Sequence, residues 1–345
     1  MMLRIKGDKV VLPKGSFDEQ EYGYYGRLKG DILELSLVEA AFLIERERLN
    51  IGTSLKEFFK KASNIQPYFD LKYEVYKDLR ERGYYVQPSV TDFRLYPRGG
   101  RPGDVPASTY VYVLSERIPI PFRDILGKVN VARNVRKKML LAVVDGESDL
   151  TFYEAKSATM HGEMPAFETD LSEADATFLE DRVVIWGEPH ASELYRTGFY
   201  GKLIDDKRLQ LSLLECAYLM TRGLPVEDGA TNERFTLDHF TNRARAIEPG
   251  FMLKLGVYTD LRDRGFVVKT GFKFGSHFRA YEEVRDVSRI PHSKYLVHAL
   301  PEDYVVTLPE MSRAIRLAHG VRKRMVFAYY EQNSLEYLDI GRAKP

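Results

Sequence analysis

Three side chains in the C-terminal half of the chain have the chemistry needed to cleave a phosphodiester without a metal. Tyr281 stands in FRAY, His292 in HSKY and Lys323 in VRKR. An imidazole donates a proton to a leaving oxygen near neutral pH, and a phenol accepts one from a ribose 2′-hydroxyl where cations lower its pKa. An ammonium group stabilises the dianionic phosphorane. The set predicts acid–base catalysis with no metal and no cofactor.

The chain provides an internal control for these residues because its sequence repeats. VYKDLRERGYYV at 75–86 matches VYTDLRDRGFVV at 257–268, and further matching segments follow in the same order, 176 to 186 residues apart. A spacing that drifts slowly while the order is kept indicates a duplicated unit with small insertions. We therefore expect two tandem repeats, at 1–160 and 183–345, joined by an acidic linker at 161–182.

Alignment of the two repeats indicates that only the second has the catalytic histidine. The first repeat has Tyr96 and Lys137 but Ala107 at the histidine position, and none of the chain's seven histidines lies before residue 161. Since loss of a general acid typically costs about 10²–10⁴-fold in rate, we expect a degenerate first repeat and a catalytic second one. With 22 tyrosines in the chain, spacing alone would be a weak signal.

Each repeat has the same predicted order of elements. Short strands precede a helix whose start has the capping-box spacing, Ser36 to Glu39 and Ser212 to Glu215. A second helix ends at a glycine, several strands follow, and a last helix (near 124–136 and 309–320) leads into an apolar strand. Strands and helices mixed within one unit predict an α/β (mixed α+β) fold with a mixed sheet.

Composition restricts the class of protein. The 345 residues carry a formal charge of +1, which excludes a globally basic nucleic-acid coat but not a local basic patch. The single cysteine, Cys216, cannot form an internal disulfide, and no Cys/His cluster has zinc-ligand spacing. No stretch is long and apolar enough for a membrane span. We expect a soluble, cytoplasmic protein.

The segments KTGFKFGSHFRAYE, HSKYLVHALPED and RLAHGVRKRMVFA closely resemble the archaeal tRNA-splicing endonuclease (tRNA-intron endonuclease) family, in particular its homodimeric class with two tandem repeats per chain. The resemblance implies excision of introns from precursor tRNA by cutting both splice sites of a bulge–helix–bulge RNA. It also implies 2′,3′-cyclic phosphate and 5′-hydroxyl ends and metal-independent catalysis.

The resemblance also implies roles for single residues. Tyr281 would be the general base, His292 the general acid and Lys323 the group that stabilises the transition state. Arg316 in RLAHGVRK and Arg342 in IGRAKP would clasp a flipped bulge base by cation–π stacking.

The architecture implied by the resemblance has two parts in each repeat, a small N-terminal α/β subdomain and a C-terminal subdomain similar to restriction endonucleases. In the catalytic repeat these would cover about 183–250 and 251–345. The partners would be precursor tRNA and a second copy of the chain, with no membrane and no DNA. An acidic loop would dock at the dimer interface, either 115–124 or the loop with Glu302 and Asp303.

Two other functions stay open from the residues alone. The chain could be a non-catalytic RNA-binding or structural subunit of a splicing endonuclease, or a metal-dependent nuclease of the restriction type that uses carboxylates such as Glu282 and Glu283. In any of the RNA-binding cases we expect salt-sensitive binding, because cations gather near the predicted site. They are Arg279, Lys294, Arg316, Arg322, Lys323 and Arg324.

Overall fold

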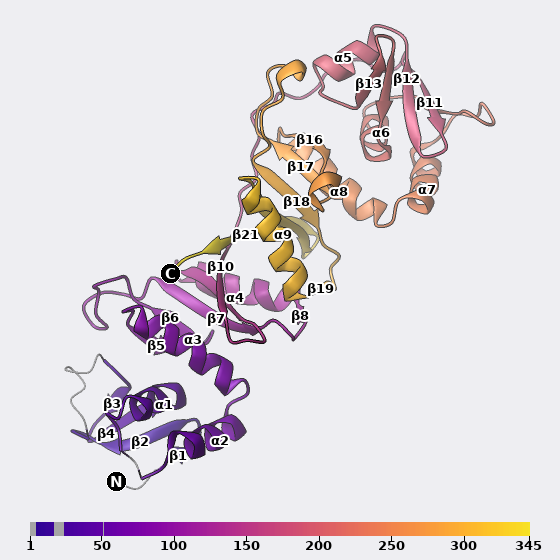
Figure 1. Ribbon diagram of the computed structural model, residues 1–345. Helices are drawn as coiled ribbons and strands as arrows, with labels where there is room; N and C mark the ends of the chain where they lie inside the picture. Colours follow the sequence, from indigo (N-terminus) through magenta and orange to yellow (C-terminus); the bar gives the residue numbers. More distant parts are fainter. Residues whose placement is uncertain (1–4, 17–23, 51) are drawn as a thin grey trace. The chain divides into compact units, whose positions relative to one another are not determined.

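The computed structural model describes residues 5–16, 24–50 and 52–345, which form two compact units (Figure 1). The first unit comprises Met1–Lys156 with Asp303–Arg313 and Ile340–Pro345, and the second comprises Ser157–Glu302 with Ala314–Asp339. Each unit contains one small sheet with helices and one larger mixed sheet with helices. The predicted α/β class and the tandem repetition are confirmed.

The first unit begins with a four-stranded antiparallel sheet of order β1-β2-β4-β3. Its strands are β1 (Ile5–Lys6), β2 (Lys9–Pro13), β3 (Arg27–Lys29) and β4 (Ile32–Ser36). Two helices follow, α1 (Leu37–Glu45) and α2 (Leu55–Ile65).

The larger part of the first unit is a mixed sheet. Helix α3 (Phe69–Glu81) precedes strands in the order β5-β6-β7-β9-β10, and only the β7–β9 pair is parallel. The crossover between these two strands contains α4 (Phe122–Asn134), as a parallel pair requires. The strands are β5 (Val86–Pro88), β6 (Phe93–Leu95), β7 (Thr109–Ser115), β9 (Lys138–Val144) and β10 (Leu150–Ser157), with the short β8 (Ile120–Pro121) paired to β19 (Val305–Val306).

The second unit repeats the small sheet with an added helix, α5 (His190–Arg196). The strand order is β13-β14-β12-β11-β15, with helices α6 (Leu213–Met220) and α7 (Leu237–Ile247) after β14. The strands are β11 (Asp175–Leu179), β12 (Arg182–Trp186), β13 (Lys202–Asp205), β14 (Arg208–Leu211) and β15 (Glu227–Asp228). Strand β11 therefore lies within the segment 161–182 that was expected to be a linker, because its alternating apolar side chains pair with β12.

The second mixed sheet has the strand order β16-β17-β18-β20-β21, and its parallel pair is β18–β20. Helix α8 (Phe251–Asp263) precedes it and α9 (Leu308–Gly320) forms the crossover. Two 3-10 turns, η1 (Phe272–Phe274) and η2 (Val287–Arg289), flank β17. The strands are β16 (Val267–Thr270), β17 (Phe278–Tyr281), β18 (Tyr295–Ala299), β20 (Arg324–Glu331) and β21 (Ser334–Ala343).

Local sequence explains where the helices begin and end. Both predicted capping boxes form. The Ser36 and Ser212 hydroxyls accept from the backbone N–H of Glu39 and Glu215, and the carboxylates of these glutamates accept from the backbone N–H of the two serines. The helices α3 and α8 are followed by Gly83 and Gly265, whose positive φ angles of 87° and 82° are readily adopted by glycine.

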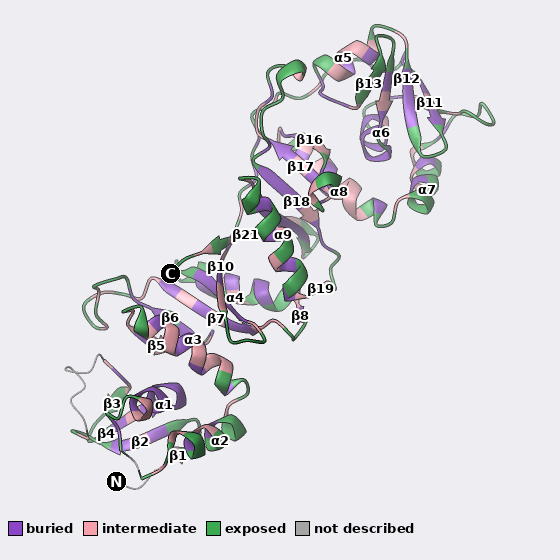
Figure 2. Ribbon diagram, viewed as in Figure 1, coloured by how far each residue is buried: buried purple, intermediate pink, exposed green. Residues whose placement is uncertain are grey.

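Each unit has its own apolar core. Strands of both mixed sheets are largely buried, and the outer sides of the helices are exposed (Figure 2). The lone cysteine, Cys216, is fully buried on α6 within the core of the second unit, and burial raises the pKa of its thiol. No helix in the described part of the chain is long and apolar enough to cross a membrane.

Candidate active site

Tyr281, His292 and Lys323 all line one cavity of about 750 Å³ in the second unit. They come from strand β17, from the loop before β18 and from the turn after α9, so the fold brings together segments that are up to 42 residues apart in sequence (323 − 281). The remaining lining includes Arg279, Lys269 and the aromatic ring of Phe274. The cavity thus combines a phenol, an imidazole and several cations.

The last residue of β17 is Tyr281, paired in register with Val267 of β16. Its side chain is only 4% exposed and packs with Phe199, Val267 and Val284. Alternation along the strand places Arg279 on the same face, and the Arg279 guanidinium lies 5.9 Å from the centre of the Tyr281 ring. The phenol ring is therefore held by apolar packing and has the Arg279 guanidinium near it.

The predicted general acid, His292, stands on the exposed loop between η2 and β18. Pro291 precedes it, and Ser293 after it is buried. The Ser293 hydroxyl has no hydrogen-bond partner among the described residues. An exposed imidazole beside a buried anchor can reach a substrate oxygen while its backbone stays fixed.

The side chain of Lys323 bonds to that same loop. Helix α9 ends in a turn in which Arg322 takes the left-handed conformation (φ 56°), and Lys323 follows. The Lys323 Nζ donates to the carbonyl oxygen of Ser293 at 2.9 Å and lies 5.8 Å from the centre of the Phe274 ring. Burial and the nearby Arg279 charge lower the pKa of Lys323 below its ordinary value.

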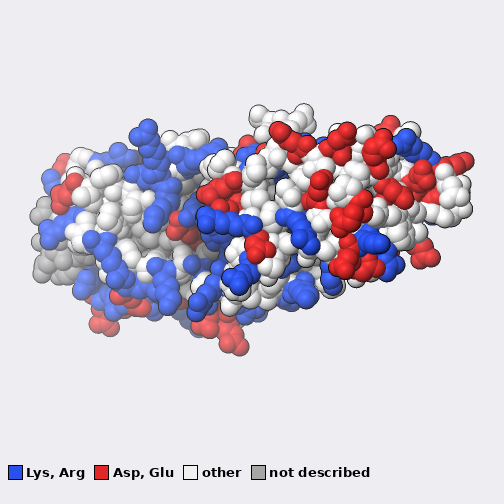
Figure 3. Space-filling model, turned by 90° about the horizontal axis from the view of Figure 1, so that it is seen from above, with Lys and Arg blue, Asp and Glu red and all other residues white. Residues whose placement is uncertain are grey.

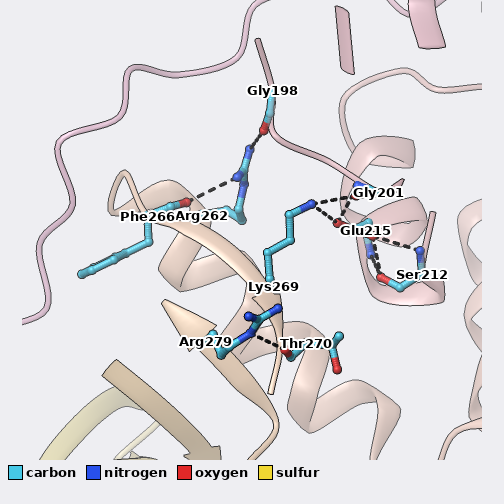
Figure 4. A network of polar contacts seen from close by, with 9 residues as sticks. All are labelled: Gly198, Gly201, Ser212, Glu215, Arg262, Phe266, Lys269, Thr270 and Arg279. Atoms are coloured by element: carbon cyan, nitrogen blue, oxygen red, sulfur yellow. Dashed lines mark hydrogen bonds and ion pairs between the residues drawn. The ribbon is translucent and has the colours of Figure 1, made fainter. Parts of the chain in front are cut away.

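A polar network connects the mixed sheet to the small sheet of the second unit (Figure 4). The Lys269 Nζ donates to the carbonyl oxygen of Gly201 at 2.9 Å and lies 3.6 Å from the Glu215 carboxylate. Glu215 also accepts from the backbone amides of Gly201 and Ser212. Arg262 donates to the Gly198 carbonyl at 3.0 Å. These bonds hold the segment 198–201 against β16.

The site of the first repeat that corresponds to the Tyr281 cavity has different contacts. Its Tyr96 hydroxyl donates to the Gln87 amide oxygen at 2.7 Å, and Arg94 bonds to the same oxygen. Gln87 occupies the place of Lys269, since each pairs across the strands with the aligned arginine. The cavity here, lined in part by Tyr96, is about 250 Å³. The tyrosine of this smaller cavity is bonded to a neutral amide, and the first repeat lacks both the imidazole and a counterpart of Lys269.

Strand register refines the comparison at the histidine. The β7–β9 and β18–β20 ladders correspond with an offset of 186 residues, one more than the offset of 185 that aligns Ala107 with His292. The position of His292 in the first repeat therefore falls on Ala107 or on Pro106 before it. Neither side chain can transfer a proton.

The two arginines of the predicted clasp are both exposed. Arg316 lies on α9 and Arg342 on β21 near the C-terminus. Their joint role stays a prediction.

Not all of the predicted cations are free to bind phosphate. Lys294 forms an ion pair with Glu282 at 2.6 Å, and Arg324 forms one with Asp339. In the described part of the chain Arg279, Arg316, Arg322 and Lys323 have no such ion pair. Acidic and basic side chains both occur on the face drawn in Figure 3, so the positive charge available to RNA is local.

The carboxylates proposed for a metal-dependent reaction are engaged with cations. Glu282 pairs with Lys294, and Glu283 pairs with Arg285 at 2.7 Å. Among the described residues, no group of three or more His, Cys, Asp or Glu side chains is placed to hold a metal ion.

Sequence reasoning missed most of the cavity lining, including three residues that contact or surround the predicted set: Lys269, Phe274 and Ser293. A signal existed for the first, because Lys269 aligns with Gln87 when the two repeats are compared strand by strand. Phe274 and Ser293 give no such signal, since their roles depend on contacts with Lys323 across the fold.

Comparisons with known proteins match the whole of this architecture. The model of the tRNA intron endonuclease catalytic C-terminal domain matches residues 69–152 and 251–337, and that of the N-terminal domain matches 1–59 and 174–231. A protein named tRNA-splicing endonuclease from Methanococcoides burtonii is 52% identical over 100% of both chains. One from Methanosarcina mazei is also 52% identical, over 99% of this chain and 98% of its own. One from Natronomonas pharaonis is 39% identical over 97% of both chains.

Proposed function

The chain belongs to the tRNA intron endonuclease family, and from this premise we propose that it excises introns from precursor tRNA by cleaving the RNA strand at both splice sites. One observation carries the proposal: Tyr281, His292 and Lys323, from three separate segments, line a single cavity. The proposed substrate is a bulge–helix–bulge RNA.

The proposed chemistry is transesterification within the RNA. Tyr281 accepts the proton of a ribose 2′-hydroxyl, and the 2′-oxygen attacks the adjacent phosphorus. As that bond forms, the bond from phosphorus to the 5′-oxygen breaks, and His292 donates a proton to the leaving oxygen. The products are a 2′,3′-cyclic phosphate and a 5′-hydroxyl. The proton acceptor acts on the 2′-oxygen and the proton donor on the 5′-oxygen. Because the attacking oxygen belongs to the RNA itself, this step needs no water.

Charge stabilisation in this step belongs to Lys323. Its ammonium group lies in the cavity and pairs with a carbonyl oxygen rather than with a carboxylate. A cation not neutralised by a carboxylate is well suited to stabilise negative charge on the phosphorane oxygens. Arg279, bonded to the carbonyl oxygen of Thr270 at 2.9 Å, adds positive charge beside Tyr281.

The number of complete sites supports a homodimer. The first repeat lacks the imidazole, so each chain supplies one set of the three residues and an intron has two junctions. Two copies related by a twofold axis give two equivalent sites at a fixed separation. In such a dimer Arg316 and Arg342 would clasp an unpaired bulge base between their guanidinium planes.

Cleavage of a bulge–helix–bulge RNA in excess EDTA, with analysis of both new ends, tests the proposal. We expect cuts in both bulges, cyclic phosphate ends, and loss of cleavage of about 10²–10⁴-fold in His292→Ala. His319→Ala is the matched control, because His319 is also exposed but does not line the cavity.

Other outcomes would identify the alternatives. Cleavage that needs added divalent metal would favour a carboxylate-based nuclease. RNA that is bound and left whole would indicate a scaffold for a separate catalytic subunit. A single-chain mass in solution at micromolar concentration would overturn the homodimer.

A further inference from the structure

A second cavity, of about 450 Å³, adjoins the catalytic cavity in the second unit. The two share Gly201, Lys202, Lys269 and Thr270, so the Lys269 side chain forms part of the wall between them. The second cavity lies between α8, the strands β14, β16 and β17, the start of α6 and the segment after α5. Its volume is within the range of about 300–1,000 Å³ typical of ligand sites.

Four of the five charged side chains that line this second cavity form ion pairs with one another. Lys254 forms an ion pair with Glu248 at 2.9 Å, and Lys269 lies 3.6 Å from Glu215. These two ammonium groups are neutralised by two carboxylates, so Lys202, shared with the catalytic cavity, is the one charged side chain of the lining without an ion pair among the described residues. A neutral ligand that forms hydrogen bonds fits this lining better than an anion does.

Two further groups that line the second cavity can form additional hydrogen bonds. The Tyr258 hydroxyl belongs to a side chain that is 2% exposed, and it has no partner among the described residues. His277 accepts the Ala299 backbone N–H at Nδ1, 3.0 Å away, so its neutral ring carries its proton on Nε2. Burial lowers the pKa of His277 to about 3, so the ring is neutral at physiological pH.

An exposed aromatic ring stands at the rim of the second cavity. Phe272 is 87% exposed, the highest value among the large hydrophobic residues that the structure leaves exposed. The loop that carries Phe272 is tightly packed, because a Cβ at Gly271 would overlap the Ser276 hydroxyl. Gly275 in the same loop has a positive φ of 61°. The Phe274 amide donates to the Gly271 carbonyl oxygen at 2.8 Å. The ring is therefore presented to solvent on a preformed turn.

The first repeat lacks this feature. Its corresponding β5–β6 connection is 89–92, whereas the β16–β17 connection is 271–277, three residues longer (7 − 4). An aliphatic side chain, Val90, is exposed there, at 75%. The longer loop and its aromatic ring occur only in the repeat that has the complete catalytic set.

We propose that this second cavity, with Phe272 at its rim, is a subsite for the unpaired nucleobase next to the cleaved phosphodiester. A base is planar, neutral and able to form hydrogen bonds, and bases of single-stranded RNA stack on aromatic rings. The cationic catalytic cavity takes the phosphate, and the cavity beside it, in which most charges are paired, takes the base. The proposal rests on the proposed RNA cleavage.

The test combines variants with modified RNA. Bulge–helix–bulge RNA is prepared intact and with an abasic residue at each bulge position in turn, and single-turnover cleavage is measured. We expect Phe272→Ala to slow cleavage of intact RNA roughly 5- to 150-fold, which corresponds to the stacking energy of one base. One abasic substitution should slow the unchanged protein similarly and have no further effect on Phe272→Ala.

Two matched controls come from the first repeat. Val90→Ala removes the exposed side chain of the shorter loop, and Tyr76→Phe removes a hydroxyl that is buried and unpartnered like that of Tyr258. Neither should change cleavage. Tyr258→Phe keeps the packing and should alter the preference among bases at the same bulge position. Thermal melting of each variant shows whether it is folded.

The outcomes separate this inference from the proposed function. If Phe272→Ala cleaves intact and abasic RNA as fast as the unchanged protein, only the base subsite is overturned. A change of mass in solution caused by Phe272→Ala, with unchanged cleavage per site, would make the ring a contact to a second copy and would also overturn it. If the unchanged protein leaves the RNA whole, both proposals fail.

Discussion

Lys323 donates a 2.9 Å hydrogen bond from its Nζ to the carbonyl oxygen of Ser293, the residue that directly follows His292. This bond joins the turn after α9 to the loop before β18. The predicted transition-state cation therefore also holds the backbone of the predicted general acid. Removal of Lys323 would change both the charge in the cavity and the position of the imidazole.

We expect Lys323→Ala to reduce single-turnover cleavage by at least about 10²-fold, because it removes a group aimed at developing charge. Its matched control is Lys137→Ala, at the aligned turn of the first repeat, where no imidazole exists. Rates measured side by side on one RNA check this. Equal losses in both variants would mean that the effect is structural and not located at the cavity.

The two aligned tyrosines should respond in opposite ways to loss of the hydroxyl. Tyr281→Phe removes the predicted base, so cleavage should fall about 10²–10⁴-fold with little change in melting temperature. Tyr96→Phe removes a hydrogen bond to Gln87, so stability should fall by about 0.5–1.5 kcal/mol while cleavage is kept. Denaturant unfolding and cleavage rates together test the pair. Full cleavage by Tyr281→Phe would exclude it as the base.

Much of the fold was predictable because it depends on local signals. The capping boxes at Ser36 and Ser212 and the glycines that follow the second helices set helix boundaries within a few residues. Repetition of the sequence then predicted repetition of the fold. The acidic segment before residue 183 gave no clear strand signal, since β11 is short and is stabilised by pairing with β12.

The candidate site was predictable in part, for a similar reason. Tyr281, His292 and Lys323 stand in recognisable motifs, but the support around them comes from distant segments. Ser293 and Phe274 contact Lys323 only because α9 returns the chain to β18. The ion pairs of Lys294 and Arg324 likewise depend on partners 12 and 15 residues away (294 − 282 and 339 − 324), so sequence reasoning counted both residues as free cations.

Substitution of Lys269 by the residue of the first repeat should loosen the contact between β16 and the segment 198–201. Lys269→Gln removes the bond to the Gly201 carbonyl and the ammonium group beside Glu215. Glu39, the counterpart of Glu215, bonds to the same kinds of amide without a lysine, so we expect a loss of about 1–3 kcal/mol and a folded protein. Urea unfolding measures it. A stability equal to the unchanged protein would show that the network contributes nothing.

Salt dependence should distinguish the paired cations from the unpaired ones. If Arg322 contacts a phosphate, Arg322→Gln should reduce the slope of log affinity against log salt concentration by about 0.7–0.9 in magnitude. Lys294→Gln should leave the slope nearly unchanged, because Glu282 already neutralises Lys294. Filter binding to a cleavage-resistant RNA at several salt concentrations tests this. Equal slopes for both variants would contradict the distinction.

The free energy of unfolding should fall as the pH drops from about 6.5 towards 3, because His277 protonates more readily in the unfolded chain than in the folded one. Burial, the neighbouring His298 and the Lys254 charge lower the pKa of His277 to about 3, against an ordinary value of 6.5. Between these values the unfolded chain binds the proton more readily than the folded one, so stability rises with pH there. The contribution is complete above about pH 6.5 and is lost as the pH falls towards 3.

His277→Gln tests this directly, because an amide oxygen can still accept the Ala299 N–H but does not titrate. Its unfolding free energy should depend less on pH between about 4 and 6.5 than that of the unchanged protein. Some dependence remains from His298, which stacks on His277 with ring centres 4.2 Å apart and whose pKa burial also lowers. Urea unfolding at several pH values provides the measurement. Identical pH dependence in both proteins would mean that the imidazole of His277 is solvated well enough to protonate in the folded state.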